Sequence, residues 1–149
     1  MKPKVVICRG LPGSGKSTWS RQFVRTHKNW ARVCKQDIRR DVFENPDEGF
    51  DGKDNFAGRS DSVVCRISDV TITSLLEVGY SVIIDGINLN PNSLSRLKTF
   101  IGKRASVRIK NFTEVPLSLC LDRNSRRSRE HPVSSVYIRR LARLYLKGE

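Results

Sequence analysis

Residues 10 to 17 place three glycines, a lysine and a serine at the spacing of a phosphate-binding loop. The stretch fits the pattern GxxxxGK[ST] in full and consists of Gly10, Leu11, Pro12, Gly13, Ser14, Gly15, Lys16 and Ser17. Glycines let the backbone turn its N–H groups toward phosphates, Lys16 can reach the β- and γ-phosphates, and Ser17 offers a hydroxyl to Mg²⁺. Thr18 can assist at the α-phosphate. The loop predicts bound Mg-ATP or another nucleoside triphosphate, and it leaves the phosphate acceptor open.

A carboxylate that could serve as a general base lies at Asp37, with Arg40 three residues later. Phosphoryl transfer to a hydroxyl needs such a group to orient the nucleophile and accept its proton. On a helix, this spacing puts both side chains on one face, so Arg40 could hold an anionic part of the substrate beside the base. A helix-start aspartate with an ion-pairing arginine would look the same, and the residue types alone leave both interpretations open.

Asp85 and Asn88 follow an apolar segment, 80–84, that has the composition of a buried strand. An acid in this position is typical of a Walker B-type residue, which supports Mg²⁺ directly or through water. Asn88 lies close enough in sequence to contribute to substrate binding at the same place. The alternative is a turn carboxylate at the end of a strand.

Arginines are concentrated between residues 123 and 129, where Arg123, Arg126 and Arg127 could close over the nucleotide as a lid. A guanidinium there would lie near the β- and γ-phosphates, where charge builds up during transfer. A solvated polar loop is the other interpretation of such a charge run.

Alternating apolar runs and helical patterns must position these groups, and they predict an α/β fold with a parallel sheet of about four strands flanked by helices. The expected strands are 4–9, 31–35, 80–84 and 105–112, the last of them at a sheet edge. The expected helices are 16–27, 38–43, 60–78, 90–101, 116–123 and 133–146, with a mobile loop at 44–59. Because ligands bind at the carboxyl ends of parallel strands, the phosphate loop, Asp37 and Asp85 should converge.

The chain is strongly basic, with 28 Lys and Arg against 15 Asp and Glu, a net charge of +13 and a pI near 10.2. Its 149 residues make one expected domain, 1–149. From residue 96 onward, fourteen basic residues face four acidic ones. Such a surface attracts polyanions, although a basic face without a specific partner is also possible.

Four widely separated cysteines, Cys8, Cys34, Cys65 and Cys120, indicate free thiols of a reducing compartment. The two histidines are isolated, so a zinc site is not expected. Asp47, Asp51 and Asp54 do not fit the calcium-loop pattern. No apolar run approaches the length of a membrane span or a signal peptide, and we therefore expect a cytoplasmic protein.

Four segments together resemble the polynucleotide 5′-hydroxyl kinase family, in particular the kinase domain of its T-even phage members. They are GLPGSGKSTW at 10–19, KQDIRRDVF at 35–43, VIIDGINLNP at 82–91 and LDRNSRR at 121–127, and the resemblance extends over nearly the whole chain. The resemblance implies a P-loop kinase fold with a C-terminal arginine-rich lid and an active-site tunnel. It implies ATP-dependent phosphorylation of 5′-OH ends of DNA or RNA during end repair, with a functional link to a nucleic-acid ligase.

The resemblance also implies roles for individual residues. Asp37 matches the general base, Arg40 the arginine that holds the phosphate on the 3′ side of the acceptor nucleoside, and Arg127 the lid arginine on the donor phosphates. Arg123 and Arg126 match further lid positions near the nucleotide. The T-even acid of the third segment aligns with Gly86, whereas related kinases carry it at the Asp85 position. A DxDxT phosphatase signature is absent, so 3′-phosphate removal is not expected.

Two other functions fit the phosphate loop. A P-loop phosphotransferase acting on a nucleoside, sugar or antibiotic would use the same loop, base and lid, but it would gain nothing from the basic C-terminal third. A nucleotide-dependent regulatory module would bind ATP without transfer chemistry. The choice between DNA and RNA, and the oligomeric state, stay open.

Overall fold

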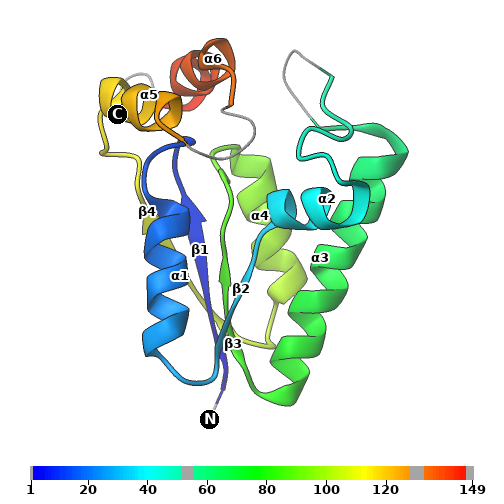
Figure 1. Ribbon diagram of the computed structural model, residues 1–149. Helices are drawn as coiled ribbons and strands as arrows, with labels where there is room; N and C mark the ends of the chain where they lie inside the picture. Colours follow the sequence, from blue (N-terminus) through cyan, green and yellow to red (C-terminus); the bar gives the residue numbers. More distant parts are fainter. Residues whose placement is uncertain (1, 52–55, 128–132, 147–149) are drawn as a thin grey trace.

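The computed structural model describes residues 2–51, 56–127 and 133–146, and its central element is a parallel sheet. The four strands are β1 (Lys4–Arg9), β2 (Trp30–Val33), β3 (Ser81–Ile84) and β4 (Ser106–Asn111). Their order is β2-β3-β1-β4, and every neighbouring pair is parallel (Figure 1). Ile7 lies beside Ile84 on one side and Ile109 on the other, so the strands end close to one level. The predicted α/β fold is confirmed.

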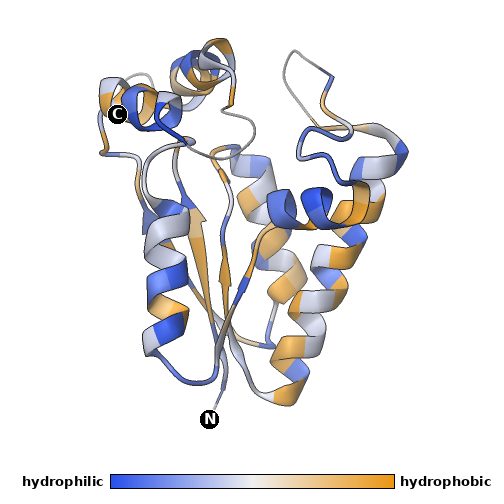
Figure 2. Ribbon diagram, viewed as in Figure 1, coloured by the Kyte–Doolittle hydropathy of each residue, from blue (hydrophilic) through white to orange (hydrophobic). Residues whose placement is uncertain are grey.

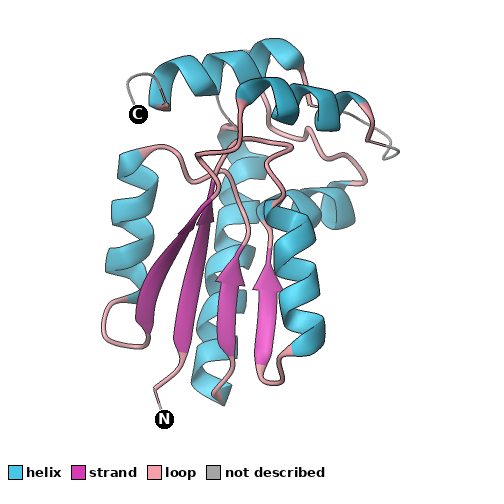
Figure 3. Cartoon of the chain, turned by 90° about the vertical axis from the view of Figure 1, so that its left-hand side faces the viewer, coloured by secondary structure: helices cyan, strands magenta, loops and turns pink. Residues whose placement is uncertain are grey.

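Six helices surround the sheet in the described part of the chain. They are α1 (Lys16–Thr26), α2 (Lys35–Phe43), α3 (Gly58–Val78), α4 (Pro91–Ile101), α5 (Leu117–Ser125) and α6 (Ser135–Tyr145). Helix α1 lies on one face of the sheet, and α3 and α4 cover the other (Figure 1). Helices α5 and α6 lie across the carboxyl ends of the strands, above the arrowheads in Figure 3.

The core lies between the sheet and the pair α3 and α4. Val5, Ile7, Val82 and Ile84 of the two central strands pack there against apolar side chains of both helices. Strands β1 and β3 are buried by neighbours on each side, which explains why they are apolar almost throughout (Figure 2). A smaller cluster around Leu11, Leu89 and Cys120 joins the phosphate loop to α5 and α6. Both clusters fix the ends of the strands relative to the helices above them.

Two predicted boundaries near the site were wrong by two or three residues. Helix α2 begins at Lys35 rather than residue 38, which puts Asp37 in its first turn. Helix α5 continues to Ser125, so Arg123 is a helical residue and does not open a loop. In the second case, buried Cys120 and Asn124 hold the last turn, and the Asn124 side chain bonds the backbone of Val133 in both directions. Tertiary contacts outweighed the low helix propensity of the segment.

The predicted loop 44–59 is partly described. Phe50 and Phe56 pair as an isolated β-bridge, and α3 already begins at Gly58. Residues 52–55, including Asp54, and residues 128–132, including Arg129 and His131, lie outside the described residues. The arginine-rich lid therefore stays a prediction. Among the described helices, none has the length and apolar character required to cross a bilayer.

Candidate active site

The phosphate loop follows β1 and turns directly into α1, as the sequence predicts. Gly13 (φ 84°) and Gly15 (φ 100°) adopt the left-handed conformation that favours glycine. Gly13 also lies against α5, because a Cβ at this position would be 2.4 Å from the carbonyl oxygen of Cys120. The loop is thus held from above by α5 and leads into the N-terminus of α1, where N–H groups and the helix dipole favour an anion.

Lys16 is buried and directed back at the loop. Its Nζ donates to the backbone oxygen of Leu11 at 2.6 Å and to the hydroxyl of Ser14 at 3.3 Å. Burial lowers the pKa of Lys16 to about 8, although the charge of Asp85 acts in the opposite direction. Burial removes the water that would stabilise the charged ammonium, and an anion bound at the neighbouring backbone N–H groups would restore this stabilisation. A triphosphate is such an anion.

Asp85 is almost fully buried at the end of β3 and receives donors on a single oxygen. Its Oδ2 accepts from Nη2 of Arg32 at 2.6 Å, from Nε of Arg32 at 2.8 Å and from the hydroxyl of Ser20 at 3.2 Å. Ser20 lies on the first turns of α1, so this carboxylate connects β3 with the helix that carries the phosphate loop. The predicted convergence of Asp85 and the loop on one place is observed.

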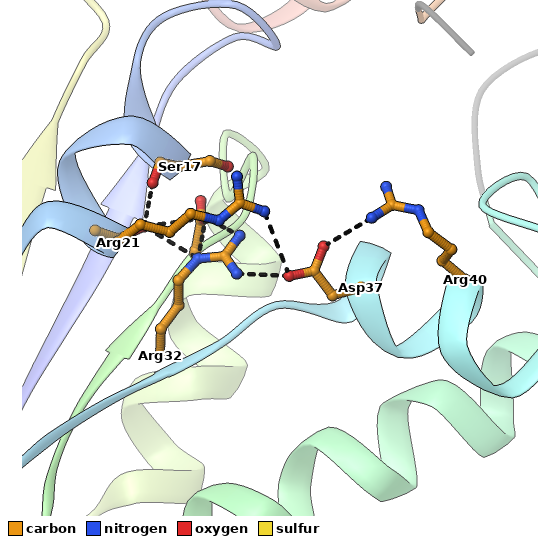
Figure 4. A network of polar contacts seen from close by, with 7 residues as sticks. Ser17, Arg21, Arg32, Asp37 and Arg40 are labelled. Carbon is orange, nitrogen blue, oxygen red and sulfur yellow. Dashed lines mark hydrogen bonds and ion pairs between the residues drawn. The ribbon is translucent and has the colours of Figure 1, made fainter. Parts of the chain in front are cut away.

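Asp37 lies in the same network, on the side of α2. Its carboxylate accepts from Nη1 of Arg32 at 2.5 Å and is 3.5 Å from Nη1 of Arg40 and 3.9 Å from Nη2 of Arg21 (Figure 4). The side chain is 29% exposed, so a substrate can reach it. Arg40 pairs with Asp37, which is the alternative interpretation that the residue types left open, and three arginines hold this carboxylate. A contact of Arg40 with substrate stays a prediction.

Arg32 is the residue that sequence reasoning missed. Its guanidinium joins Asp37 to Asp85, and although burial by itself would lower the pKa of Arg32, Cys34 and the two carboxylates raise it above its usual value. One signal was available in the sequence. Arg32 alternates with Val33 in β2, so it points to the face opposite the core, where α1 brings Ser20 and Arg21.

Asn88 has a structural contact in addition to its predicted substrate role. Its side-chain amide donates to the backbone oxygen of Cys8 at 2.8 Å, and its backbone is left-handed (φ 48°). Next to it, the carbonyl of Ile87 accepts from the N–H of Gly10 at 3.0 Å. The turn after β3 is therefore bonded to the end of β1 and to the start of the phosphate loop. A contact of Asn88 with substrate stays a prediction.

Arg123 lies in the last turn of α5, and Arg126 and Arg127 follow the end of this helix at Ser125. Nη1 of Arg123 donates to the backbone oxygen of Gly13 at 3.4 Å, which places this side chain over the phosphate loop. Arg126 is exposed and pairs with Asp122 at 3.3 Å, and Arg127 is exposed at the end of the described segment. Arg123 is the lid candidate that already contacts the loop, while the roles of Arg126 and Arg127 stay predictions.

A magnesium ion would have to be held mainly by the nucleotide. No group of three or more His, Cys, Asp or Glu side chains lies at metal-binding distance within residues 2–51, 56–127 and 133–146. The oxygen ligands that the site offers are the Ser17 hydroxyl and the Asp85 carboxylate, whose contacts all fall on Oδ2. This donor set fits Mg²⁺, which usually takes one or two protein oxygens and completes its shell with phosphates and water.

Replacing Gly13 with Ala tests the packing of α5 on the loop. The new Cβ would overlap the Cys120 carbonyl, and the left-handed backbone would be strained, so we expect the free energy of unfolding to fall by about 2 kcal/mol or more and ATP affinity to fall at least about tenfold. Gly79→Ala is the matched control, because Gly79 is also left-handed (φ 101°) but nothing lies within 4 Å of its Cβ position.

Urea unfolding and calorimetric ATP titration of both variants make the comparison. Gly79→Ala should cost about 1–2 kcal/mol and leave ATP binding unchanged. Equal ATP affinity in Gly13→Ala and wild type would contradict the contact between α5 and the loop.

The chain is similar to a family model, to a viral protein and to chains of solved structures. A family model described as AAA domain matches residues 5–144. A protein of Autographa californica nuclear polyhedrosis virus, described as a bifunctional polynucleotide kinase/RNA ligase, is 24% identical over 153 residues, which span 97% of this chain and 21% of the viral protein.

Among solved structures, a chain of the Pnkp1/Rnl/Hen1 RNA repair complex is 26% identical with a TM-score of 0.80, over 97% of this chain and 44% of that one. The APS kinase CysC of Mycobacterium tuberculosis shares the fold, with 17% identity and a TM-score of 0.59 over 84% of this chain and 70% of that one. The chain thus spans about a fifth of the viral relative and less than half of the repair-complex chain.

Proposed function

We propose that this chain, which belongs to the AAA domain family through residues 5–144, transfers the γ-phosphate of ATP to the 5′-hydroxyl ends of RNA or DNA. At the level of the family, the resemblance to polynucleotide kinases drawn from four sequence segments is confirmed, and the chain is a P-loop kinase. The observation that carries the acceptor proposal is the position of Asp37. Its partly exposed carboxylate is joined through Arg32 to Asp85 and Ser20, at the helix of the donor loop.

In this proposal, the donor half consists of the phosphate loop with Lys16, Ser17 and Thr18. Ser17 and Asp85 would hold Mg²⁺, which would neutralise charge on the β- and γ-phosphates. Arg123, Arg126 and Arg127 contact the phosphates of the donor nucleotide.

The acceptor half consists of Asp37 and Arg40, with Asn88 at its edge. Asp37 accepts the proton of the attacking 5′-hydroxyl, and Arg40 pairs with the phosphate on the 3′ side of the terminal nucleoside. Arg32 orients the Asp37 carboxylate, because its guanidinium donates a charge-assisted hydrogen bond to Oδ2.

A polynucleotide acceptor is favoured over a small neutral one by charge and by similarity. The net charge of +13 is concentrated from residue 96 onward. Binding of nucleic-acid phosphates to these basic residues would release counterions, which favours binding of a polynucleotide. The name of the viral relative joins a polynucleotide kinase to an RNA ligase, and the other relative is a chain of the Pnkp1/Rnl/Hen1 RNA repair complex. We infer that this chain also acts before a ligase. The APS kinase likeness supports only the shared fold.

The decisive assay offers ATP labelled in its γ-phosphate together with 5′-OH RNA, 5′-OH DNA and free nucleosides. We expect label on at least one of the oligonucleotides, and the ratio between RNA and DNA measures the preference that the sequence leaves open. Oligonucleotides that already carry a 5′-phosphate are the matched control and should receive no label. Transfer to nucleosides alone would favour the small-molecule phosphotransferase, and binding of ATP without transfer to any acceptor would favour a regulatory module.

A further inference from the structure

A polar cavity of about 190 Å³ lies beside the acceptor half of the site. It is bordered by the start of α2, the turn after β3, the first turns of α4 and one face of α6, elements that gather at the carboxyl end of the sheet (Figure 1). Its lining includes Lys35, Ile87, Asn88, Arg96, Tyr137 and Tyr145. This volume is below the roughly 300–1,000 Å³ of most small-molecule pockets, which suits part of a polymer better than a whole ligand.

The lining combines positive charge with aromatic rings. Lys35 and Arg96 are basic, and no carboxylate is among the lining residues. Arg96 forms an exposed pair with Asp69 at 3.3 Å, and such surface pairs are weak enough to be exchanged for a phosphate. The N-terminus of α4 lies at the same wall, where Asn90 caps the helix by accepting from the N–H of Asn92 at 2.9 Å. The cavity therefore presents a positive potential to a ligand.

The aromatic side is provided by α6. Tyr137, Leu141 and Tyr145 are spaced by four residues and line the cavity together. The ring of Tyr137 meets that of Phe50 edge-on, with centroids 5.2 Å apart, so α6 contacts the segment between α2 and α3 at this point. Half-buried tyrosines beside cations are the combination that proteins use to bind single-stranded nucleic acid, with bases on rings and phosphates on basic groups.

The position of the cavity connects it to the acceptor end. Lys35 precedes Asp37 by two residues on α2, and Ile87 and Asn88 follow Asp85 closely after β3. A strand whose 5′-hydroxyl lies at Asp37 would thus have this cavity at the same end of the sheet (Figure 1). We propose that the cavity, which we name the strand groove, binds the nucleotides that follow the 5′-terminal one in a single-stranded acceptor. This inference rests on the proposed function. It adds that the enzyme recognises more of the acceptor strand than its 5′-terminal nucleotide.

The test compares a groove variant with a control from the same helix. Lys35→Gln combined with Arg96→Gln removes the positive charge of the groove, whereas Lys98→Gln removes an exposed charge of α4 that does not line it. We measure kcat/KM for a single-stranded 5′-OH 10-mer and for a nucleoside 3′-phosphate, each with its melting temperature. The ratio of the two values should fall about tenfold in the groove variant, since two phosphate contacts are lost, and should not change in Lys98→Gln.

A second measurement separates this inference from the proposed function. Fluorescence anisotropy of the 10-mer labelled at its 3′ end reports binding without chemistry, and we expect the groove variant to bind about tenfold more weakly, with a smaller salt dependence. If wild type transfers phosphate to both acceptors but the groove variant keeps the wild-type ratio and affinity, the strand groove is wrong and the kinase stands. If wild type transfers phosphate to neither acceptor, the proposed function is wrong. In that case, unchanged binding of the 10-mer in the groove variant overturns the groove as well.

Discussion

Asp37→Ala is expected to reduce phosphoryl transfer by about 10²–10⁴-fold, because it removes the group that accepts the proton of the attacking hydroxyl. Affinity for ATP should stay within a few-fold of wild type, since the contacts of Asp37 are with Arg21, Arg32 and Arg40 rather than with the phosphate loop. The loss should therefore fall on kcat at saturating ATP. Single-turnover assays with labelled ATP and calorimetric titration of the nucleotide measure the two quantities separately.

Two further variants show whether the effect belongs to the carboxylate. Asp37→Asn keeps the size of the side chain and removes its basicity, so it should lose nearly as much activity as Asp37→Ala. Asp41→Ala removes an exposed acid from the same helix and should retain activity close to wild type. A rate for Asp37→Ala within tenfold of wild type would mean that another group accepts the proton or that none is needed.

The structure of the phosphate loop and of the elements on each side of it could be predicted almost completely from the sequence. The phosphate-loop pattern is local, so a strand, a glycine turn and a helix follow from residues 4–26 without knowledge of the rest of the chain. The strand β1 was predicted with its observed bounds. The meeting of Asp37 and Asp85 with this loop was also predictable, because the carboxyl ends of parallel strands lie at one edge of the sheet.

The contacts that hold the two carboxylates could not be predicted in the same way. Arg32 belongs to no recognised motif. Its contacts with Ser20 and Asp85 depend on which face of β2 is turned toward α1. The packing of α5 on Gly13 likewise joins residues more than a hundred positions apart in the chain. Local patterns carry no information on such distant pairs, and a helix end such as that of α5 is set by them.

Arg32→Met should have the largest effect on stability among single changes in the site. The side chain of Asp85 is only 2% exposed, and removal of its partner would leave an uncompensated buried charge, which typically costs about 3–5 kcal/mol. Asp37 would also lose its shortest contact, so transfer should fall at least about tenfold through misorientation of the base. Urea unfolding at neutral pH measures the effect on stability, and the labelled-ATP assay measures the effect on transfer. Arg32→Lys should restore only part of the stability and part of the activity, because an ammonium lacks the planar set of donors with which the guanidinium bonds both carboxylates.

The double variant Arg32→Met with Asp85→Asn distinguishes charge from packing. Because it removes both members of the buried pair, it should unfold at a higher urea concentration than Arg32→Met alone, by an amount equivalent to about 1–3 kcal/mol. Its transfer activity should stay low, since Asp37 still lacks Arg32 and the site lacks the Asp85 carboxylate. If Arg32→Met unfolds at the same urea concentration as wild type, the pair contributes nothing to folding and Arg32 serves only to position Asp37. If the double variant is no more stable than Arg32→Met, the loss comes from the packing of the arginine side chain in β2 rather than from an unpaired carboxylate.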